Sequence, residues 1–241
     1  MEVIMSLDNK HIKNLSKLLL KKYRDSEGMF LVEGEHLVEE AKRSGCLLEV
    51  VRTEDYDENY GVRNTLVTYE VIKKLSNSIT PQKVIGVCKK QEEKKIGNKI
   101  LILDNIQDPG NLGTIIRSSV AFNIDTIVLS KDTVDLYNDK VLRSSEGMLF
   151  HQNIIKRDLG EFLEELHAQG YVVMGTRVTG GENIKTVETP EKVAIVMGNE
   201  GAGVRKEILD KCDKYLYIPM NTDCESLNVG VATSIILYEL F

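Results

Sequence analysis

Short apolar runs alternate along the chain with segments in which apolar residues recur every three or four positions. An apolar run of four or five residues between polar or turn-forming residues predicts a buried strand, and the wider spacing predicts an amphipathic helix. Strands are expected at 29–32, 47–51, 66–68, 84–88, 100–103, 126–129, 171–175, 193–197 and 215–218. Helices are expected at 10–24, 35–43, 71–75, 158–169 and 229–237, with one more beginning at Leu112. Strand and helix alternate in the second half, which predicts an α/β fold with a mainly parallel sheet.

A polar segment divides the chain into two predicted domains. Residues 91–98 are rich in charge and lack an apolar period, so they can bury little surface and are expected to form a linker. The first domain, residues 1–90, is then a small α/β domain. The second, residues 99–241, contains the larger sheet.

Composition narrows the class of protein. The 241 residues carry a net charge of −6 and ordinary fractions of apolar and charged residues. Cys46, Cys88, Cys212 and Cys224 have neither Cys-x-x-Cys spacing nor a nearby histidine, so we expect reduced thiols and no metal site. No apolar run reaches membrane-spanning length and the amino terminus lacks a secretory pattern, so we expect a cytoplasmic protein with no membrane partner.

The first predicted helix has a strongly basic side. Lysine and arginine recur from residue 10 to residue 24 without an acidic residue between them, and the apolar side is made by Ile12, Leu15, Leu18 and Leu19. Two interpretations are open, a solvated helix face and a face that contacts phosphates. For the second, the candidate residues are Lys13, Lys17, Lys21, Lys22 and Arg24.

The stretch 100–122 reads as a strand, a loop and a helix. Turn-forming residues at 108–111 separate the apolar run from a helical pattern at Leu112, Ile115 and Ile116, and Arg117 falls outside that apolar face. A loop that opens onto helix amides beside an arginine suits an anionic or phosphate-bearing ligand. The alternative is an ordinary βα turn with a solvated arginine.

Two further polar loops follow predicted strands. The run 193–197 leads into Gly-Asn-Glu-Gly-Ala-Gly at 198–203, where glycine allows a ligand to approach the backbone closely. Ile218-Pro-Met220 is followed by Glu225-Ser-Leu-Asn228 and then by the uncharged stretch 229–237, which predicts a buried helix. Ser226 is either a helix cap or a functional residue. Loops at the carboxyl ends of parallel strands are where a ligand is expected.

Together these three loops resemble the signature motifs of the SpoU (TrmH-type) RNA 2′-O-ribose methyltransferases of the SPOUT superfamily. The segments that carry the resemblance are 105–117, 197–203 and 218–229, in the family's order and spacing. Residues 138–147 are similar to the family's segment between the first two motifs, and they add Arg143 to the candidate RNA-binding residues. Residues 14–40 resemble the family's amino-terminal RNA-binding domain, which favours the phosphate-contacting interpretation of the basic side.

The resemblance implies a fold, a cofactor and partners. The fold would be a small L30e-like α/β substrate-binding domain followed by a SPOUT α/β catalytic domain with a carboxy-terminal trefoil knot. The methyl donor would be S-adenosyl-L-methionine, and no metal is implied. The partners would be structured RNA and a second copy of the chain, since the family's active site lies at a homodimer interface.

The resemblance also assigns residues position by position. Gly198, Ile218, Met220, Leu227 and Glu200 match cofactor-binding positions, and Asn111, Arg117, Glu200, Ser226 and Asn228 match positions of catalysis and substrate placement. A guanidinium is always protonated in proteins, so our hypothesis is that Arg117 binds phosphate and stabilises the alkoxide. Glu200 or a phosphate oxygen would help to receive the proton. Gly230 and Glu146 depart from the family pattern, which has serine and a small or apolar residue there.

The resemblance and the two-domain layout favour methylation of a ribose 2′-hydroxyl in 23S-type large-subunit ribosomal RNA. One alternative is a transfer RNA 2′-O-methyltransferase, and another is a non-catalytic RNA-binding factor for ribosome assembly. A dinucleotide-dependent enzyme is disfavoured because no Gly-x-Gly-x-x-Gly follows the first strand of the second domain.

Overall fold

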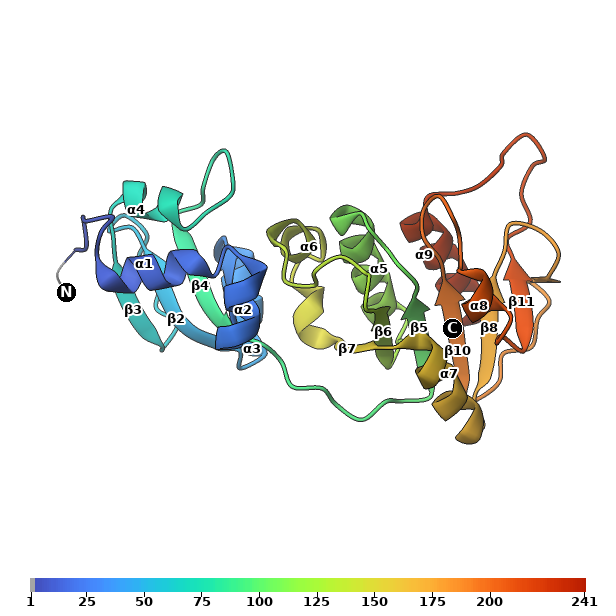
Figure 1. Cartoon of the computed structure of the whole chain (residues 1–241). Helices are drawn as coiled ribbons and strands as arrows, with labels where there is room; N and C mark the ends of the chain where they lie inside the picture. Colours follow the sequence, from blue (N-terminus) through green and yellow to red (C-terminus); the bar gives the residue numbers. More distant parts are fainter. Residues whose placement is uncertain (1–2) are drawn as a thin grey trace. The chain divides into compact units, whose positions relative to one another are not determined.

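The computed structural model describes residues 3–241, which form two compact units (Figure 1). The amino-terminal unit comprises the chain up to Glu92 together with Asp135–His151. The carboxy-terminal unit comprises Glu93–Val134 and Gln152–Phe241. A segment from within the second predicted domain therefore packs as part of the amino-terminal unit.

The amino-terminal unit is built on a four-stranded sheet of order β1-β4-β2-β3. The strands are β1 (Met29–Glu33), β2 (Leu47–Arg52), β3 (Arg63–Leu66) and β4 (Val84–Lys89). The central β4 is antiparallel to β1 and β2, and β3 is parallel to β2. The helices are α1 (Lys10–Lys17), α2 (Lys21–Glu27), α3 (Glu35–Arg43) and α4 (Tyr69–Lys74), with α6 (Asp139–Ser144) and the 3₁₀ turn η1 (Met148–His151) from the later segment.

The basic stretch at 10–24 forms two helices, so the prediction of a single helix is wrong. Asn9 caps α1 by accepting hydrogen bonds from the N–H groups of His11 and Ile12. The buried Arg24 donates to the carbonyls of Leu18 and Leu19, and it also donates to Asp135 at 2.6 Å. The helix break is stable because a guanidinium satisfies carbonyls that a continuing helix would have bonded.

The carboxy-terminal unit contains a seven-stranded, all-parallel sheet of order β7-β6-β5-β10-β8-β11-β9 (Figure 1). The strands are β5 (Lys99–Leu103), β6 (Thr126–Ser130), β7 (Asn153–Arg157), β8 (Val172–Thr176), β9 (Glu182–Asn183), β10 (Val193–Met197) and β11 (Lys214–Tyr217). The helices are α5 (Pro109–Ala121), α7 (Leu159–Ala168), α8 (Lys206–Leu209) and α9 (Val229–Leu240). The predicted mainly parallel sheet is confirmed.

The centre of this sheet positions the functional loops. β5 and β10 are adjacent, with Leu103 opposite Met197, so the loops that leave their carboxyl ends begin side by side. Alternate residues of these strands, such as Ile100 and Val196, pack into one core with the apolar side of α7. These two strands are buried except at Lys99, and close packing holds the loop origins in fixed positions.

Helix α9 packs along α5 (Figure 1). The hydroxyls of Ser118 and Ser234 meet between the two helices at 2.6 Å. The prediction that this uncharged helix is buried is wrong for one of its faces. Val231, Ile235 and Tyr238 recur at helical spacing and are exposed in the single chain. No helix formed by residues 3–241 has the length and apolar character that crossing a membrane requires.

Candidate active site

The Glu200 carboxylate, in the loop after β10, is held by donors from the loop after β5 and from its own loop. Its Oε1 accepts from Asn111 Nδ2 at 3.0 Å and from the N–H of Asp108 at 3.2 Å. Its Oε2 accepts from the N–H of Gln107 at 3.4 Å and from Asn199 Nδ2 at 3.2 Å. The carboxylate therefore ties the amino-terminal end of α5 to the loop that follows β10.

Asn228 adds the third loop to this arrangement. Its Nδ2 donates to Asn111 Oδ1 at 2.8 Å, and its own Oδ1 caps α9 by accepting from the N–H groups of Gly230 and Val231. A continuous chain of hydrogen bonds thus runs from Asn228 through Asn111 to Glu200. The structure thus brings together Asn111, Glu200 and Asn228, three of the five residues that the family resemblance assigned to catalysis and substrate placement.

These contacts also set the charge of Glu200. Burial raises the pKa of its carboxyl, but the hydrogen bonds donated by Asn111 and by the backbone N–H groups of Asp108 and Gln107 together outweigh burial, so the pKa lies below its usual value. Glu200 is therefore ionised at neutral pH and is a weak base. The carboxylate suits a role in holding the loops better than a role in accepting a proton.

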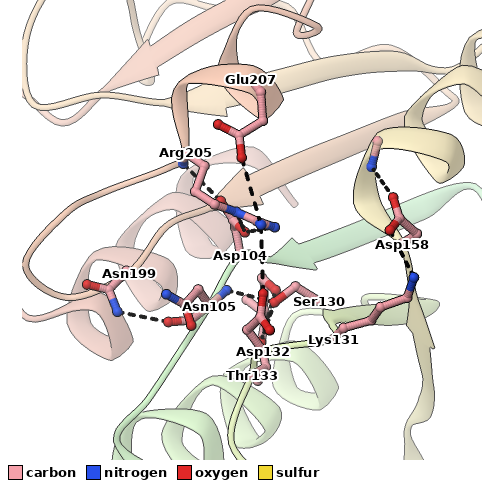
Figure 2. A network of polar contacts seen from close by, with 12 residues as sticks. Asp104, Asn105, Ser130, Lys131, Asp132, Thr133, Asp158, Asn199, Arg205 and Glu207 are labelled. Carbon is pink, nitrogen blue, oxygen red and sulfur yellow. Dashed lines mark hydrogen bonds and ion pairs between the residues drawn. The ribbon is translucent and has the colours of Figure 1, made fainter.

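An ion pair between the buried Asp104 and the partly exposed Arg205, which the sequence interpretation missed, fixes the same loops (Figure 2). Asp104, at the end of β5, is fully buried; its Oδ1 accepts from Arg205 Nε at 2.8 Å and its Oδ2 from the N–H of Arg205 at 2.9 Å. In Figure 2 the guanidinium lies between Asp104, Asp132 and Glu207. A buried carboxylate is expensive unless paired, so this pair joins the first and second loops firmly.

Asn199 and Asn105 connect the ends of three neighbouring strands (Figure 2). Asn199 Nδ2 donates to the carbonyl of Asn105 at 2.9 Å, and the N–H of Asn105 donates to Ser130 Oγ at 2.9 Å. Asn105 has a positive φ of 61°, a conformation that asparagine tolerates better than most residues. The carboxyl ends of β5, β6 and β10 are therefore cross-linked by side chains.

A cavity of about 200 Å³ lies beside this network. Its lining includes every residue that the family resemblance assigned to the cofactor, namely Gly198, Glu200, Ile218, Met220 and Leu227. Ser226 also lines the cavity. The remaining wall includes the apolar residues Val204 and Ile236, and Thr176, Arg177 and Val178 at the end of β8. Such a lining can hold an apolar ring system and hydrogen-bond its polar edges.

Arg117 lies apart from that cavity. Its side chain is exposed on α5, and within residues 3–241 the structure gives it neither a hydrogen bond nor an ion pair. Asn111 and Asn228 also lie outside the cavity lining. Asn111 bonds to Glu200 in the cavity wall, and Asn228 bonds to Asn111. The arginine is therefore free to meet a ligand that approaches from solvent.

The predicted RNA-binding residues all lie in the amino-terminal unit. Lys13, Lys17, Lys21 and Lys22 are exposed, and Arg143 is an exposed residue paired with Asp139. Arg24 is buried and uses its guanidinium within the protein, so we remove it from the candidate set. Charge pattern alone does not distinguish a buried arginine from a solvated lysine.

The two departures from the family pattern have different surroundings. At Gly230, a Cβ would meet Asn228 Oδ1 at 3.2 Å and the Thr114 side chain at 3.2 Å, so Thr114 occupies space that a serine would need. Glu146 has a positive φ of 48° and belongs to the amino-terminal unit, whereas the three catalytic loops belong to the carboxy-terminal unit. Within residues 3–241 no group of His, Cys, Asp and Glu is arranged to hold a metal.

Comparison with known proteins identifies the family. Residues 98–238 match the SpoU rRNA Methylase family, and residues 9–86 match the MRM3-like substrate binding domain. The chain is 39% identical over its full length, and over 99% of the relative's length, to the 23S rRNA (guanosine(2553)-2'-O)-methyltransferase RlmP of Bacillus subtilis.

Solved structures agree with the sequence comparison. A putative RNA methyltransferase of the TrmH family from Porphyromonas gingivalis superposes with a TM-score of 0.88 at 29% identity, covering 97% of this chain and 98% of that one. An AdoMet-bound rRNA methyltransferase from Sinorhizobium meliloti superposes with a TM-score of 0.86 at 29% identity, covering 99% and 96%. The chain belongs to the SpoU family of RNA methyltransferases.

Proposed function

We propose that this protein transfers the methyl group of S-adenosylmethionine to a ribose 2′-hydroxyl in large-subunit ribosomal RNA. As an SpoU family member it is an RNA 2′-O-methyltransferase that uses this cofactor. The likeness to a 23S ribosomal RNA methyltransferase extends over both units, and this observation favours ribosomal RNA over transfer RNA. The lining of the catalytic cavity fits the cofactor's adenine ring and polar groups.

The reaction requires proximity of the reactants, removal of the hydroxyl proton and stabilisation of the alkoxide that develops. The cofactor supplies an electrophilic methyl group on a sulfonium. We assign Arg117 to the adjacent phosphate and the developing alkoxide, because its guanidinium is always charged and has no hydrogen bond or ion pair among residues 3–241. Asn111 and Asn228 orient the ribose, and Ser226 lies in the cavity wall beside the reacting groups.

Glu200 acts as the clamp of the site in this proposal. Its four donors and lowered pKa disfavour proton transfer to its carboxylate, so of our two hypotheses we retain a phosphate oxygen of the RNA as the proton acceptor. The clamp keeps Asn111 at the start of α5, with its side chain bonded to both Glu200 and Asn228.

The reaction and its target can be tested in one assay. The full chain is incubated with S-adenosylmethionine carrying a labelled methyl group and total RNA from cells that lack the protein, and the RNA is then separated and digested to nucleosides. We expect a labelled 2′-O-methylnucleoside in large-subunit ribosomal RNA. Label in transfer RNA would support the alternative target. The absence of label from total RNA, and from assembling ribosomal particles of the same cells in a second incubation, would contradict the proposal.

We further propose that the lysines on α1 and α2 contact RNA phosphates. Replacing Lys13, Lys17 and Lys22 together by alanine is expected to weaken RNA binding and to reduce the slope of log affinity against log salt concentration by about two, since each contact contributes about 0.7. Fluorescence anisotropy at several salt concentrations measures the slope. Lys42, Lys73 and Lys83, replaced together, provide a control with the same change of charge, and an equal effect in both triple variants would contradict specific contacts.

We also propose a homodimer formed through α9. Its exposed apolar face carries Val231, Ile235 and Tyr238, which a second copy would cover. Ile235→Glu is expected to convert the dimer to a monomer without unfolding it, because the side chain is exposed in the single chain; sedimentation velocity reports the mass. Ile79→Glu is the matched control, since Ile79 is fully exposed in the other unit. A monomeric native protein would contradict the proposal.

Three finer features of the family complete the proposal. The predicted domain limits, 1–90 and 99–241 with a linker at 91–98, follow the family's two-domain layout. A trefoil knot in the carboxy-terminal segment is supported by the gathering of the loops after β10 and β11 around one cavity. Cytoplasmic location is supported by the proposed substrate, because ribosomal RNA is matured there in bacteria.

A further inference from the structure

A second cavity, of about 490 Å³, lies entirely within the amino-terminal unit. It is enclosed by α1 and α2 on one side and by the sheet on the other. Leu15, Leu18, Met29 and Val87 supply an apolar floor, and the polar lining consists of His11, Asn14, Lys17, Tyr23, Glu27, Glu49 and Arg63. A cavity of this size with an apolar floor and convergent polar side chains is typical of a small-ligand site.

Glu49 is the polar group that is most firmly held in this cavity. Its side chain is 7% exposed, and its Oε1 accepts from Thr65 Oγ1 at 2.6 Å and from His11 Nε2 at 2.8 Å. Arg63 Nε lies 3.6 Å from the same oxygen. Within residues 3–241 the structure gives Oε2 no hydrogen bond. One oxygen thus fixes the carboxylate, and the other remains able to accept from a ligand.

Tyr23 provides an aromatic surface at the same cavity. The ammonium groups of Lys17 and Lys22 lie 5.9 and 5.8 Å from the centre of its ring. Lys17 is also a lining residue, and both lysines belong to the proposed phosphate-contacting set. A base stacked on this ring would therefore have its neighbouring phosphates close to cations.

We propose that this cavity binds one unstacked guanine of the RNA substrate, separately from the nucleotide that is methylated. The inference rests on the proposed function, because it takes RNA as the ligand of the amino-terminal unit. Proteins read single-stranded RNA by stacking bases on aromatic rings and hydrogen-bonding their Watson–Crick edges. Guanine presents two adjacent N–H donors on that edge, N1–H and the 2-amino group, whereas adenine, cytosine and uracil each present one donor group. The free Oε2 of Glu49 has two lone pairs and can accept from both donors, so this carboxylate favours guanine.

The test compares short RNAs that differ in one base. Fluorescently labelled pentauridylates with guanosine, inosine or adenosine at the centre are titrated with the full chain, and anisotropy gives the affinities. We expect guanosine to bind about tenfold more tightly than adenosine, with inosine between them because it lacks the 2-amino group. Glu49→Gln is expected to abolish this preference, and Glu70→Gln, the same change at an exposed surface position, is expected to retain it.

A second variant keeps the test decisive if Glu49→Gln does not fold. Tyr23→Leu is expected to weaken the binding of all three RNAs at least fivefold and to leave the order of their affinities unchanged. Tyr69→Leu, at an exposed tyrosine of the same unit, is expected to have no such effect. Equal affinity of the native chain for the three RNAs, or a guanosine preference that survives in Glu49→Gln, would overturn the proposal. A guanosine preference without methyl transfer would contradict the proposed reaction alone, and methyl transfer without the preference would contradict this inference alone.

Discussion

Replacing Gly198 by alanine is expected to abolish S-adenosylmethionine binding. Gly198 lies directly after β10 in the cavity wall, and a Cβ there would overlap the backbone nitrogen of Val204 and the carbonyl group of Gly203. Backbone atoms cannot rotate away as a side chain does, so the loop would have to open. Opening would break the paired hydrogen bonds between Asn199 and Gly203, at 2.9 and 3.0 Å, which form the turn.

The chain offers a matched control in the same loop. A Cβ at Gly201 would find its nearest neighbour, Asn199 Oδ1, at 3.8 Å, and Gly201 has no positive φ, so alanine fits there. Isothermal titration calorimetry with the cofactor should give at least a hundredfold loss for Gly198→Ala and less than a threefold change for Gly201→Ala. Near-native affinity in Gly198→Ala would show that the cofactor binds elsewhere.

Local pattern was sufficient for most elements of the fold. The helix at Glu35–Arg43 matches its prediction, because the apolar residues Leu37, Val38 and Ala41 recur on one face and Gly45 follows its end. β7 and β9 were missed for a physical reason: Asn153–Arg157 has only two adjacent apolar residues, and Glu182–Asn183 has none. Such strands form because a parallel neighbour supplies their hydrogen bonds.

The assignment of Asp135–His151 to the amino-terminal unit could not be predicted from local pattern. It depends on contacts between residues far apart in the chain, such as the ion pair of Arg24 with Asp135 and the packing of the Phe30 ring against Tyr137 and Phe150. Hydrophobic periodicity reports which residues are buried and gives no information about the partner. The burial of Arg24 could not be predicted for the same reason, because it depends on a partner that is distant in the chain.

The site residues were predicted from the three sequence motifs, and the residues that were missed lie just outside those motifs. Glu200, Asn111 and Asn228 come from three separate segments, and only the family resemblance indicated that they meet. Asp104 and Arg205 lie at the edges of two motifs, where an acidic residue directly follows a buried strand. The position of Asp104 could have predicted the ion pair, because a carboxylate at the end of a central strand is buried and needs a cationic partner.

Arg117→Ala is expected to lower kcat by about a thousandfold, or roughly 4 kcal/mol of transition-state stabilisation, while cofactor affinity stays unchanged. The effects on kcat and on cofactor affinity should differ because Arg117 is outside the cavity that Gly198 and Leu227 line. Among the residues that the structure describes, it also has no hydrogen-bond or ion-pair partner to lose. Single-turnover methyl transfer and calorimetry measure the two effects separately. Arg157→Ala, at a surface arginine paired with Glu93 in the same unit, is the control and should retain activity.

Arg117→Lys distinguishes charge from shape. Lysine keeps the positive charge but loses the planar fork that binds two oxygens of a phosphate and alkoxide pair at once. We therefore expect turnover between that of Arg117→Ala and the native enzyme, still reduced at least thirtyfold. The rate should not rise with pH through the range where lysine deprotonates, because a base is not what this position supplies. Native turnover in Arg117→Lys would contradict the bidentate role, and a rate that rises as the lysine loses its proton would instead assign proton removal to this position.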